Sequence, residues 1–370
     1  MPDTSEDHRF PCGTCGADLR YLPGSDRLRC DHCGAEEPIE GAGPWAGAGA
    51  IRERDIRTAL DAQLPAAEME ETRVLACGNC GAQVEFEPET HAAECPFCAT
   101  PVVTGTGTHR HIKPQAVLPF ILTEDAARDA MTDWLGRLWF APNGLRQYAR
   151  KGRRMQGIYV PYWTYDADTT SRYRGQRGTV YHETRTVRVN VNGKSQTKQK
   201  RIAKVRWRNV SGQVARVFDD VLVLASRSLP KKYTDALAPW DLAGLEPYQP
   251  EYLAGFRAEA YGIDLGEGFG EAHQIMDAQI RRDIKFDIGG DRQRVTSVET
   301  DMRAVTFKHV LLPIWLAAYK YRGTTYRFVV NARTGTVQGE RPWSILKILF
   351  AVLAGAILAG ALGFFLAQTQ

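Results

Sequence analysis

The chain has 370 residues, of which 44% are hydrophobic and 24% charged, and its formal net charge at pH 7 is +4. This length allows two or three folded units, and the apolar content is ordinary for a globular protein. A net charge so close to neutral excludes any argument for an acidic or basic partner from total charge alone.

The first predicted unit is a cysteine-rich segment at residues 8–40. Two C-x-x-C pairs lie fourteen residues apart, and their members are Cys12, Cys15, Cys30 and Cys33. Four thiolates in two close pairs are typical of a tetrahedral zinc site, in which Zn–S is about 2.3 Å. We expect the glycines of the first pair, Gly13 and Gly16, to supply positive φ at the turn. The pattern predicts a zinc ribbon with four cysteine ligands.

Residues 41–73 are expected to connect this ribbon to the next unit. The stretch GAGPWAGAGA at 41–50 is typical of a flexible linker. Four apolar residues then lie near helical spacing and predict a short amphipathic helix over 51–64, namely Ile51, Ile56, Leu60 and Leu64.

The cysteine pattern repeats with the same spacing at residues 74–104. Its members are Cys77, Cys80, Cys95 and Cys98, with Gly78 and Gly81 at the turn. Disulfides and thioredoxin-like redox pairs are the alternatives, but disulfides need an exporting compartment, and no signal peptide precedes Cys12. Ribbons of this size cannot build a core, so the metal must supply folding energy. We therefore expect two Zn²⁺ per chain.

A mixed α+β domain is predicted for residues 110–340. An apolar extended run at 117–122 is followed by Thr123, a good helix N-cap with acidic residues in the first turn. One face of the helix is apolar and comprises Ala127, Met131, Trp134, Leu135 and Leu138. A second helix is predicted over 271–284, through Ala272, Ile275, Met276, Ile280 and Ile284.

Strands are predicted at 157–163, 173–180 and 184–191, and the pair Asn192-Gly193 predicts a β-hairpin. Further on, Gly289-Gly290 predicts a turn. The run 310–316 predicts a buried strand in which Pro313 marks an edge or a bulge. A partner strand at 324–330 and a turn at 331–335 complete the domain.

Basic residues are concentrated between Arg172 and Arg216, with thirteen against the single acid Glu183. We select nine as a candidate surface for anions: Arg172, Arg174, Arg177, Lys198, Lys200, Arg201, Lys204, Arg206 and Arg208. Tyr173, Tyr181 and Trp207 are interleaved with them. Lipid headgroups, nucleic acid and a hairpin charged only to resist aggregation are all consistent with this pattern.

The C-terminal segment predicts a transmembrane helix at 345–367. Residues 348–367 carry no charge, and twenty helical residues span about 30 Å, the thickness of a bilayer core. Arg341 and Lys347 lie on its N-terminal side, so the positive-inside rule places the bulk of the chain in the cytoplasm. Small residues every four positions suggest helix-mediated self-association: Ala351, Gly355, Ala359 and Gly363.

No catalytic residue is predicted. Asp219, Asp220, Asp287, Asp291 and His309 were weighed, but each residue type more often caps turns, forms ion pairs or fills cores. The Gly193-Lys194 pair lacks the preceding glycine of a phosphate-binding loop. We find no helicase, ATPase or hydrolase motif and expect a protein that is not an enzyme.

From His111 onward the chain resembles a bacterial family of membrane-anchored zinc-ribbon proteins. The stretches that carry the resemblance include 113–120, 159–163, 218–221, 252–256, 287–291, 307–315 and 330–342. The family is often labelled as similar to primosomal protein N′, a superfamily II helicase, although ATPase motifs are missing here. Its relatives occur near flotillin-like and phage-shock-type membrane-stress proteins, which implies an adaptor role and no catalytic residues.

These observations predict an α+β protein with two N-terminal four-cysteine zinc ribbons and one C-terminal transmembrane helix in the inner, cytoplasmic membrane. We expect an adaptor whose ribbons bind cytoplasmic or membrane-associated proteins. The alternative is a nucleic-acid-binding protein of replication or repair without its own ATPase motor.

Overall fold

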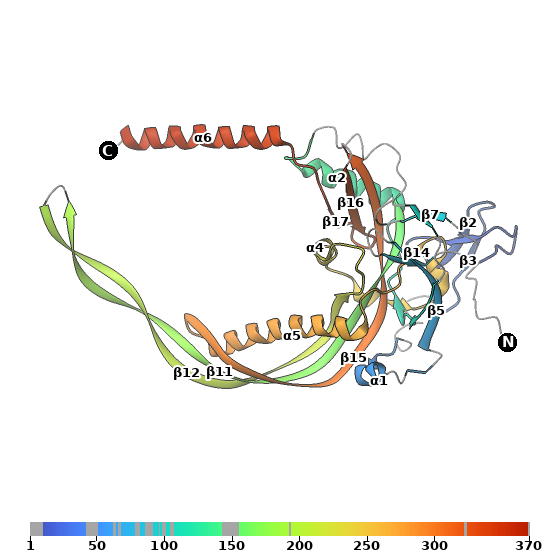
Figure 1. Ribbon diagram of the computed structural model, residues 1–370, viewed down its shortest axis with the longest axis horizontal. Coiled ribbons are helices and arrows are strands. Elements are labelled where there is room, and N and C mark those ends of the chain that lie inside the picture. Colours follow the sequence, from blue (N-terminus) through green and yellow to red (C-terminus); the bar gives the residue numbers. More distant parts are fainter. Residues whose placement is uncertain are drawn as a thin grey trace.

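The computed structural model describes residues 10–41, 51–61, 64–65, 68–77, 82–85, 92–95, 97, 101–103, 107–142, 155–191, 194–321 and 324–368. Figure 1 shows a body that holds most of the short elements, a long curved arm, and a helix, α6, that leaves the body on the same side as the arm. This mixed α+β architecture with largely antiparallel strands confirms the predicted fold class at that level.

One sheet joins nine strands among the described residues and forms the frame of both body and arm. At its centre β11 (Gln156–Val191) lies between β12 (Lys194–Leu224) and β15 (Arg292–Tyr321), antiparallel to both. Beyond β15, β10 (Ala116–Val117) runs parallel to it and pairs with β13 (Glu246–Pro247). The other members are β4 (Arg54–Asp55), β14 (Arg257–Ala258), β16 (Thr324–Asn331) and β17 (Val337–Gly339).

The three strands predicted between 157 and 191 are one continuous strand, so the predicted breaks between them are wrong. β11 pairs with β12 from Tyr162↔Leu224 out to Val191↔Lys194, with one register shift between Tyr165 and Ala167. The polar stretch between the predicted strands has weak strand propensity, but pairing with neighbours on both sides carries it. The Val191↔Lys194 pair confirms the hairpin, although its two turn residues lie outside the described residues.

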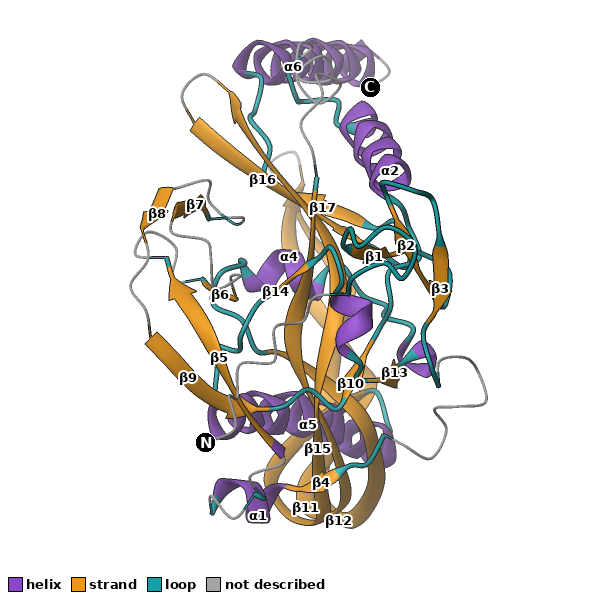
Figure 2. Ribbon diagram, turned by 90° about the vertical axis from the view of Figure 1, so that its right-hand side faces the viewer, coloured by secondary structure: helices purple, strands orange, loops and turns teal. Residues whose placement is uncertain are grey.

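In the body, side-chain alternation along the central strands separates two cores on the two faces of the sheet, and a third core lies between the sheet and the helix at 265–288. Tyr159 and Leu311 belong to one cluster, which also contains Leu19, Tyr21 and Leu28 of the first cysteine segment. Their sequence neighbours Ile158 and Val310 belong to the other cluster, together with Cys77 of the second segment. The two cysteine segments therefore pack on opposite faces of one sheet, and Figure 2 shows them on opposite sides of the body.

Helix α5 (Leu265–Ile288) lies along the base of the arm (Figure 1). Its buried residues recur every three or four positions and form one stripe: Leu265, Gly268, Ala272, Met276, Ile280, Ile284 and Ile288. The helix predicted over 271–284 is confirmed in type but is longer, because Asp264 caps it by accepting from the N–H of Glu267 at 2.8 Å. Ile275, one of the apolar residues on which the predicted helix was based, lies off this stripe and is 40% exposed.

Two polar contacts hold α5 on the arm. The Arg216 guanidinium of β12 donates to both carboxylate oxygens of Asp283, at 2.5 and 2.9 Å. The Tyr173 hydroxyl of β11 donates to Asp287 at 2.5 Å. Two paired donors of this kind fix the orientation of the helix as well as its distance from the strands.

The other two predicted helices differ in accuracy. α2 (Glu124–Arg137) begins as predicted, with the Thr123 hydroxyl accepting from the N–H of Ala126 at 3.3 Å. α1 (Ile56–Leu60) is much shorter than the predicted 51–64 helix, because residues 54–55 pair with β15 and Asp55 caps the helix there. Most of the predicted linker at 41–50 lies outside the described residues.

The remaining described elements are short. The first cysteine segment contains β1 (Leu19–Tyr21), β2 (Arg27–Cys30) and β3 (Glu36–Pro38). The second region contains β5 (Met69–Ala76), β6 (Gln83–Glu85), β7 (Ala92–Glu94), β8 (Pro101–Val103) and β9 (Gly107–Ile112). The body also holds α4 (Lys231–Asp235) and the single turns η2 (Leu242–Gly244) and η3 (Pro250–Leu253).

Pro313 pairs with Tyr159 of β11 on one side and has no strand partner among the described residues on the other, so it lies at a local edge of β15 as predicted. β10 pairs with β15 as far as Leu311, and β16 begins its pairing at Ile314. Pro313 thus lies where the outer neighbour of β15 changes, a position at which a missing N–H donor costs little. The predicted strand at 324–330 and the turn at 331–335 are confirmed.

Helix α6 (Ile345–Gln368) is the one candidate membrane span among the described residues. The span covers Ile345–Leu366, with a mean hydropathy of 2.5, and none of it is buried against the body. Its first turn is held by the body, because the N–H of Ser344 donates to Phe140 O at 2.7 Å and Lys347 Nζ donates to Ala141 O at 2.8 Å. Self-association through its small residues stays a prediction.

Two glycines of α5 offer a matched test of this packing. A Cβ at Gly268 would lie 2.6 Å from the Tyr165 hydroxyl, whereas a Cβ at Gly270 would meet nothing within 4 Å. We expect Gly268→Ala to lower the free energy of unfolding by about 1–3 kcal/mol and Gly270→Ala to raise it by up to about 1 kcal/mol. Chemical denaturation measures both, and an equal gain in the two variants would contradict the position of α5.

Candidate metal centre

Two turns of the same geometry present the cysteines of the first segment. The backbone N–H of Cys12 donates to the carbonyl of Ala17 at 2.8 Å, and that of Cys30 donates to the carbonyl of Ala35 at 2.8 Å. Each bond closes a short loop around a C-x-x-C pair, so both thiols of each pair point to the same side. The structure thus brings together all four predicted ligands of this segment.

One glycine in each turn has positive φ. Gly16 at +74° and Gly34 at +75° each donate their N–H back to the first cysteine of the pair. Gly13 was also expected to have positive φ, but this expectation is wrong. Its N–H instead donates to Glu37 Oε1 at 3.0 Å, which ties the first turn to β3.

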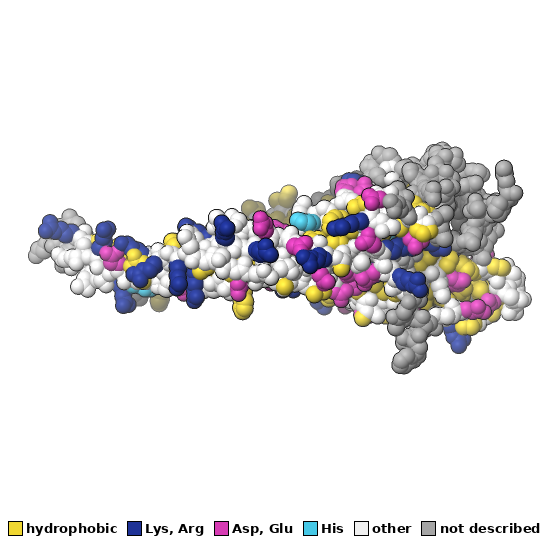
Figure 3. All heavy atoms as spheres, turned by 90° about the horizontal axis from the view of Figure 1, so that it is seen from below, with side chains coloured by type: hydrophobic (Ala, Val, Ile, Leu, Met, Phe, Trp, Pro, Cys, Tyr) yellow, Lys and Arg dark blue, Asp and Glu magenta, His cyan; other side chains and the backbone are white. Residues whose placement is uncertain are grey.

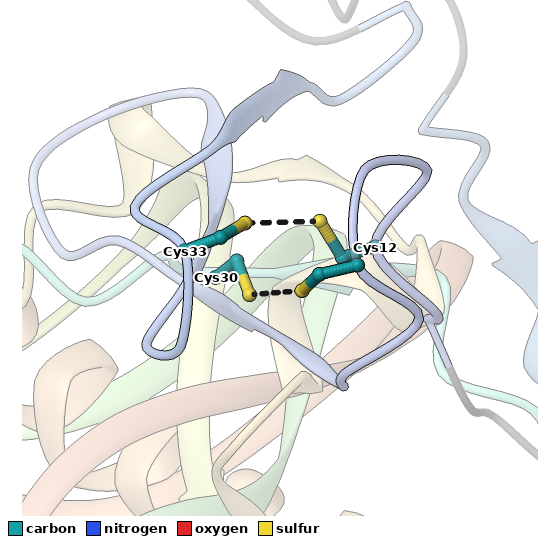
Figure 4. Close-up of side chains that lie close together, drawn as sticks. Cys12, Cys30 and Cys33 are labelled. Carbon is teal, nitrogen blue, oxygen red and sulfur yellow. Dashed lines mark hydrogen bonds between the residues drawn. The ribbon is translucent and has the colours of Figure 1, made fainter.

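The sulfur positions fit a tetrahedral ion and exclude disulfides. The Sγ atoms of Cys12 and Cys33 are 3.6 Å apart, and those of Cys15 and Cys30 are 3.5 Å apart (Figure 4). A disulfide requires about 2.05 Å, whereas thiolates about 2.3 Å from one ion lie roughly 3.8 Å apart. All four ligand atoms lie within 4.8 Å of one another, so this cluster can hold a metal ion.

The turns favour the thiolate form of the first cysteine in each pair. Backbone N–H groups of the turn, first that of Cys33 and then that of His32, hydrogen-bond the Cys30 sulfur and outweigh burial, lowering its pKa to about 6. In the first turn, the N–H groups of Thr14 and Cys15 likewise lower the pKa of Cys12. The backbone N–H groups of Ala17 and Ala35 act in the same direction on Cys15 and Cys33, but neighbouring thiols and burial outweigh them and raise the pKa of both. Metal binding requires deprotonated cysteine, so the N–H groups at Cys12 and Cys30 reduce its cost at neutral pH.

The strands of this segment are packed onto the body, while its turns face solvent. Tyr21 is buried, its N–H donates to Ala254 O at 2.9 Å, and its ring contacts Tyr252 edge-on at 5.3 Å. On the other side, Cys15 and Cys33 are exposed. The exposed surface of the segment is therefore its pair of turns.

The second cysteine segment is described only in part. The N–H of Cys77 donates to Ala82 O at 2.8 Å, the same bond that Cys12 makes to Ala17. Cys77 and Cys95 are both buried in the core on the opposite sheet face. Cys80 and Cys98, with Gly78 and Gly81, lie outside the described residues, so the predicted second tetrad stays a prediction.

A cluster of acidic residues beside the sheet surrounds a single lysine. Glu53, Asp166 and Asp219 place carboxylates within 4.8 Å of one another. The buried Lys308 ammonium lies 3.1 Å from Glu53 and 2.8 Å from Asp220. Burial opposes its charge, but the hydrogen bond and charge of Asp220 outweigh that effect and raise the pKa of Lys308.

Lys308 was missed by the sequence analysis, because a single lysine in an apolar strand gives no signal of its partners. Burial raises the pKa of its neighbour Asp166 to about 6, although the N–H of Asp220 hydrogen-bonds that carboxylate. Asp220 adopts a φ of +53° to make this contact. Lys308 forms ion pairs with two of the three grouped carboxylates, Glu53 and Asp166, so we interpret the cluster as a structural ion-pair network.

The other residues weighed for catalysis also have structural contacts. Asp287 accepts from Tyr173, and Asp291 Oδ2 accepts from the N–H of Val180 at 2.7 Å. His309 is buried with Nδ1 2.8 Å from Ile112 O, and burial lowers its pKa to about 3, which keeps it neutral.

The basic segment forms most of the arm. Figure 3 shows lysine and arginine side chains spaced along the arm. Of the nine selected residues, eight have exposed side chains among the described residues, and the side chain of Lys198 lies outside them. The interleaved aromatics are not free: Tyr173 is buried, Arg206 lies over Tyr181 at 5.3 Å, and Arg294 lies over Trp207 at 4.0 Å.

Comparison with known proteins finds a similar protein whose description assigns no function. No family model matches the chain, and no solved structure matches it. The chain is similar to the uncharacterized protein YdjG of Bacillus subtilis (strain 168), with 26% identity over 248 residues. The match covers 66% of this chain and 69% of the relative. Functional inference therefore depends on the geometry of the residues themselves.

A buried acid near the second cysteine segment makes the stability of the body depend on pH. Glu259 is 3% exposed, and its Oε1 accepts from the hydroxyls of Ser226 at 2.8 Å and Ser228 at 2.6 Å. Burial raises its pKa to about 8, more than the two hydroxyls lower it. Ala260, the next residue, donates its N–H to Gln83 O of β6 at 3.0 Å.

This acid predicts a stability that falls as pH rises. The folded state binds the Glu259 proton more tightly than the unfolded state, so stability is lost between the ordinary glutamate pKa and about 8. From pH 5 to pH 8 the loss is about 4 kcal/mol. Glu259→Gln keeps an oxygen acceptor and should remove this part of the slope in denaturation at several pH values. Identical slopes in both proteins would contradict the burial of a protonated Glu259.

Proposed function

We propose that this protein is a zinc-binding adaptor, anchored in a membrane by α6, with its body on the cytoplasmic side. The observation that carries the proposal is the four-cysteine cluster whose strands pack on the body while its turns face solvent. Such an arrangement holds two rigid loops outward. A rigid exposed loop binds a partner with little loss of conformational entropy.

Zinc is the metal that best matches the cluster. Four thiolates in a tetrahedral set favour zinc or iron–sulfur chemistry, and the donor set alone is closed, as in structural zinc sites. The Cys77 turn supports a second zinc, because its N–H bond to Ala82 repeats the bond of the Cys12 turn. When bound, the metal would lock the turns by crosslinking them, and the chain's own residues would make the contacts with a partner.

The composition of α6 supports membrane attachment, and the residues at its body side support the orientation. The helix is long and apolar enough to span a bilayer, and Arg341 and Lys347 lie on its body side. Basic residues at this position favour the cytoplasmic side. Trp343 is 55% exposed beside Arg341, at the place of an interfacial aromatic residue. The membrane-stress setting implied by the resemblance stays a prediction.

A second candidate function is binding of nucleic acid. The observation in its favour is the arm, whose exposed basic residues include Arg185, Arg206 and Arg208. Phosphate neutralisation by such residues gives binding that weakens steeply with salt. Tight, salt-sensitive binding of duplex DNA by the full chain in detergent would favour this function over the adaptor.

Zinc content is the first test. We expect two zinc ions per purified chain by mass spectrometry, falling to one in Cys15→Ser and to one in Cys77→Ser, because each variant removes one ligand of a closed set. Thr14→Ser in the first turn is the matched control and should keep both ions. A wild-type content of one ion, or a Cys15→Ser variant that keeps two, would contradict the proposed sites.

The adaptor role is tested by changing the exposed turns without touching the ligands. Thr14→Glu with His32→Glu places two acids on the turns, and His273→Glu with Gln274→Glu places two on the exposed side of α5. After crosslinking in native membranes, we expect the turn variant to lose its captured proteins at least tenfold while keeping its zinc. The α5 variant should retain them. If the turn variant captures the same proteins as the wild type, the adaptor proposal is wrong.

A further inference from the structure

The outer part of the arm has no core to stabilise it. β15 pairs with β11 as far as Gly178↔Arg292, and beyond this point β11 and β12 pair only with each other among the residues that the structure describes. We call residues 179–191 and 194–206 the distal ribbon. An isolated two-stranded ribbon is marginally stable in water, since neither face is covered. Such a ribbon gains stability when a partner covers one face.

The strand register sorts the basic side chains by face. Residues paired across strands share a face, and alternate pairs point to opposite sides. One face carries six exposed basic residues, which we call the basic face: Arg177, Arg185, Lys200, Lys204, Arg206 and Arg208. Over the same stretch, the opposite face carries Gly178/Trp207, Val180/Val205, His182/Ala203 and Thr184/Arg201, with a single basic residue. Charge placed only for solubility has no reason to favour one face.

Like charges also oppose each other directly on the basic face. Arg177 pairs with Arg208 and Arg185 with Lys200 in the register. Such pairs are destabilising in a free ribbon. Lys204 forms an ion pair with Glu183, but no carboxylate of the described residues pairs with the other five. A surface of negative charge would relieve this repulsion.

We propose that the basic face binds the anionic headgroups of the membrane that holds α6. This inference rests on the proposed attachment through α6, which leaves the body on the same side as the arm (Figure 1). The basic residues span Arg177–Arg185 on β11, about 26 Å at the usual rise of a strand, so the face matches an extended charged surface. Docking requires a bend at residues 340–344, the link without helix or strand between body and α6, and this bend would release the hydrogen bonds of Ser344 and Lys347 to the body.

The aromatic residues disfavour single-stranded nucleic acid as the partner. Stacking of bases requires several open rings beside the basic groups. Trp207 lies on the opposite face under Arg294, and the ring of Tyr181 lies under Arg206. The basic face thus offers charge without a row of stacking surfaces. This favours anionic headgroups, which attract basic residues through the negative potential of the membrane surface.

The test compares the full chain in nanodiscs of neutral phosphatidylcholine and in nanodiscs enriched in phosphatidylserine. We expect backbone amides of 179–188 and 199–208 to exchange at least tenfold more slowly in the anionic discs at low salt, and equally fast in both discs at high salt. Equal exchange at low salt would overturn the proposal. Protection by duplex DNA but not by anionic discs would replace headgroups with nucleic acid.

Two variants that each remove four positive charges distinguish the contributions of the two faces to headgroup binding. The first neutralises the basic face by Arg185→Gln, Lys200→Gln, Arg206→Gln and Arg208→Gln, and the second neutralises the opposite face by Arg172→Gln, Arg174→Gln, Arg188→Gln and Arg201→Gln. Each lost charge weakens headgroup binding about fivefold, so the first variant should lose all protection. The second should keep most of it, and equal loss in both would overturn the assignment to one face.

Failure of the membrane attachment would give a different result. A chain that does not enter either nanodisc, judged by its elution without lipid, contradicts the role of α6. Anionic vesicles can then be added to that protein, and the same exchange measurement still tests whether the basic face binds headgroups. Protection there supports the face, and its absence overturns it.

Discussion

The pairing of β11 with β12 and β15 is the interaction on which the rest of the structure depends. The same strands form the buried centre of the body and, further along, the arm. Strand alternation sends Ile158 and Tyr159 to opposite faces, so one sheet supports two cores and one cysteine segment on each. A slip of one residue would exchange the faces of all these side chains. The register is therefore specified by both cores together.

The transition from body to arm depends on a buried ion-pair network. Register shifts in β11 beside Asp166 coincide with the place where Lys308 contacts the carboxylates of Glu53 and Asp220. Buried charges are costly to desolvate, so such a network adds specificity of arrangement more than net stability. Here it joins β11, β12 and β15 to the chain just before α1. The network thus connects the strands near the place where the sheet leaves the body and begins to pack against α5.

Local signals in the sequence were sufficient for several elements and insufficient for others. Thr123 and its acidic neighbours predict the start of α2 because a cap depends on adjacent residues only. The cysteine spacing predicts the cluster for the same reason. The length of β11 was missed, since its polar middle is held by partners more than a hundred residues away. Lys308 was missed likewise, because its carboxylates come from distant segments.

Docking of the first cysteine segment changes the role that a bound metal can have. Cys12 and Cys30 belong to the same core as Phe120 and Tyr159 of the body. A metal that crosslinks these cysteines would therefore stabilise the adjoining sheet face as well as its own turns, since binding energy is shared with whatever packs against the site. A freely tethered ribbon could lose its metal without effect on the body. In this fold, a metal bound at the cluster would be linked through the contact of Tyr21 with Phe120 to the core that packs on the central strands.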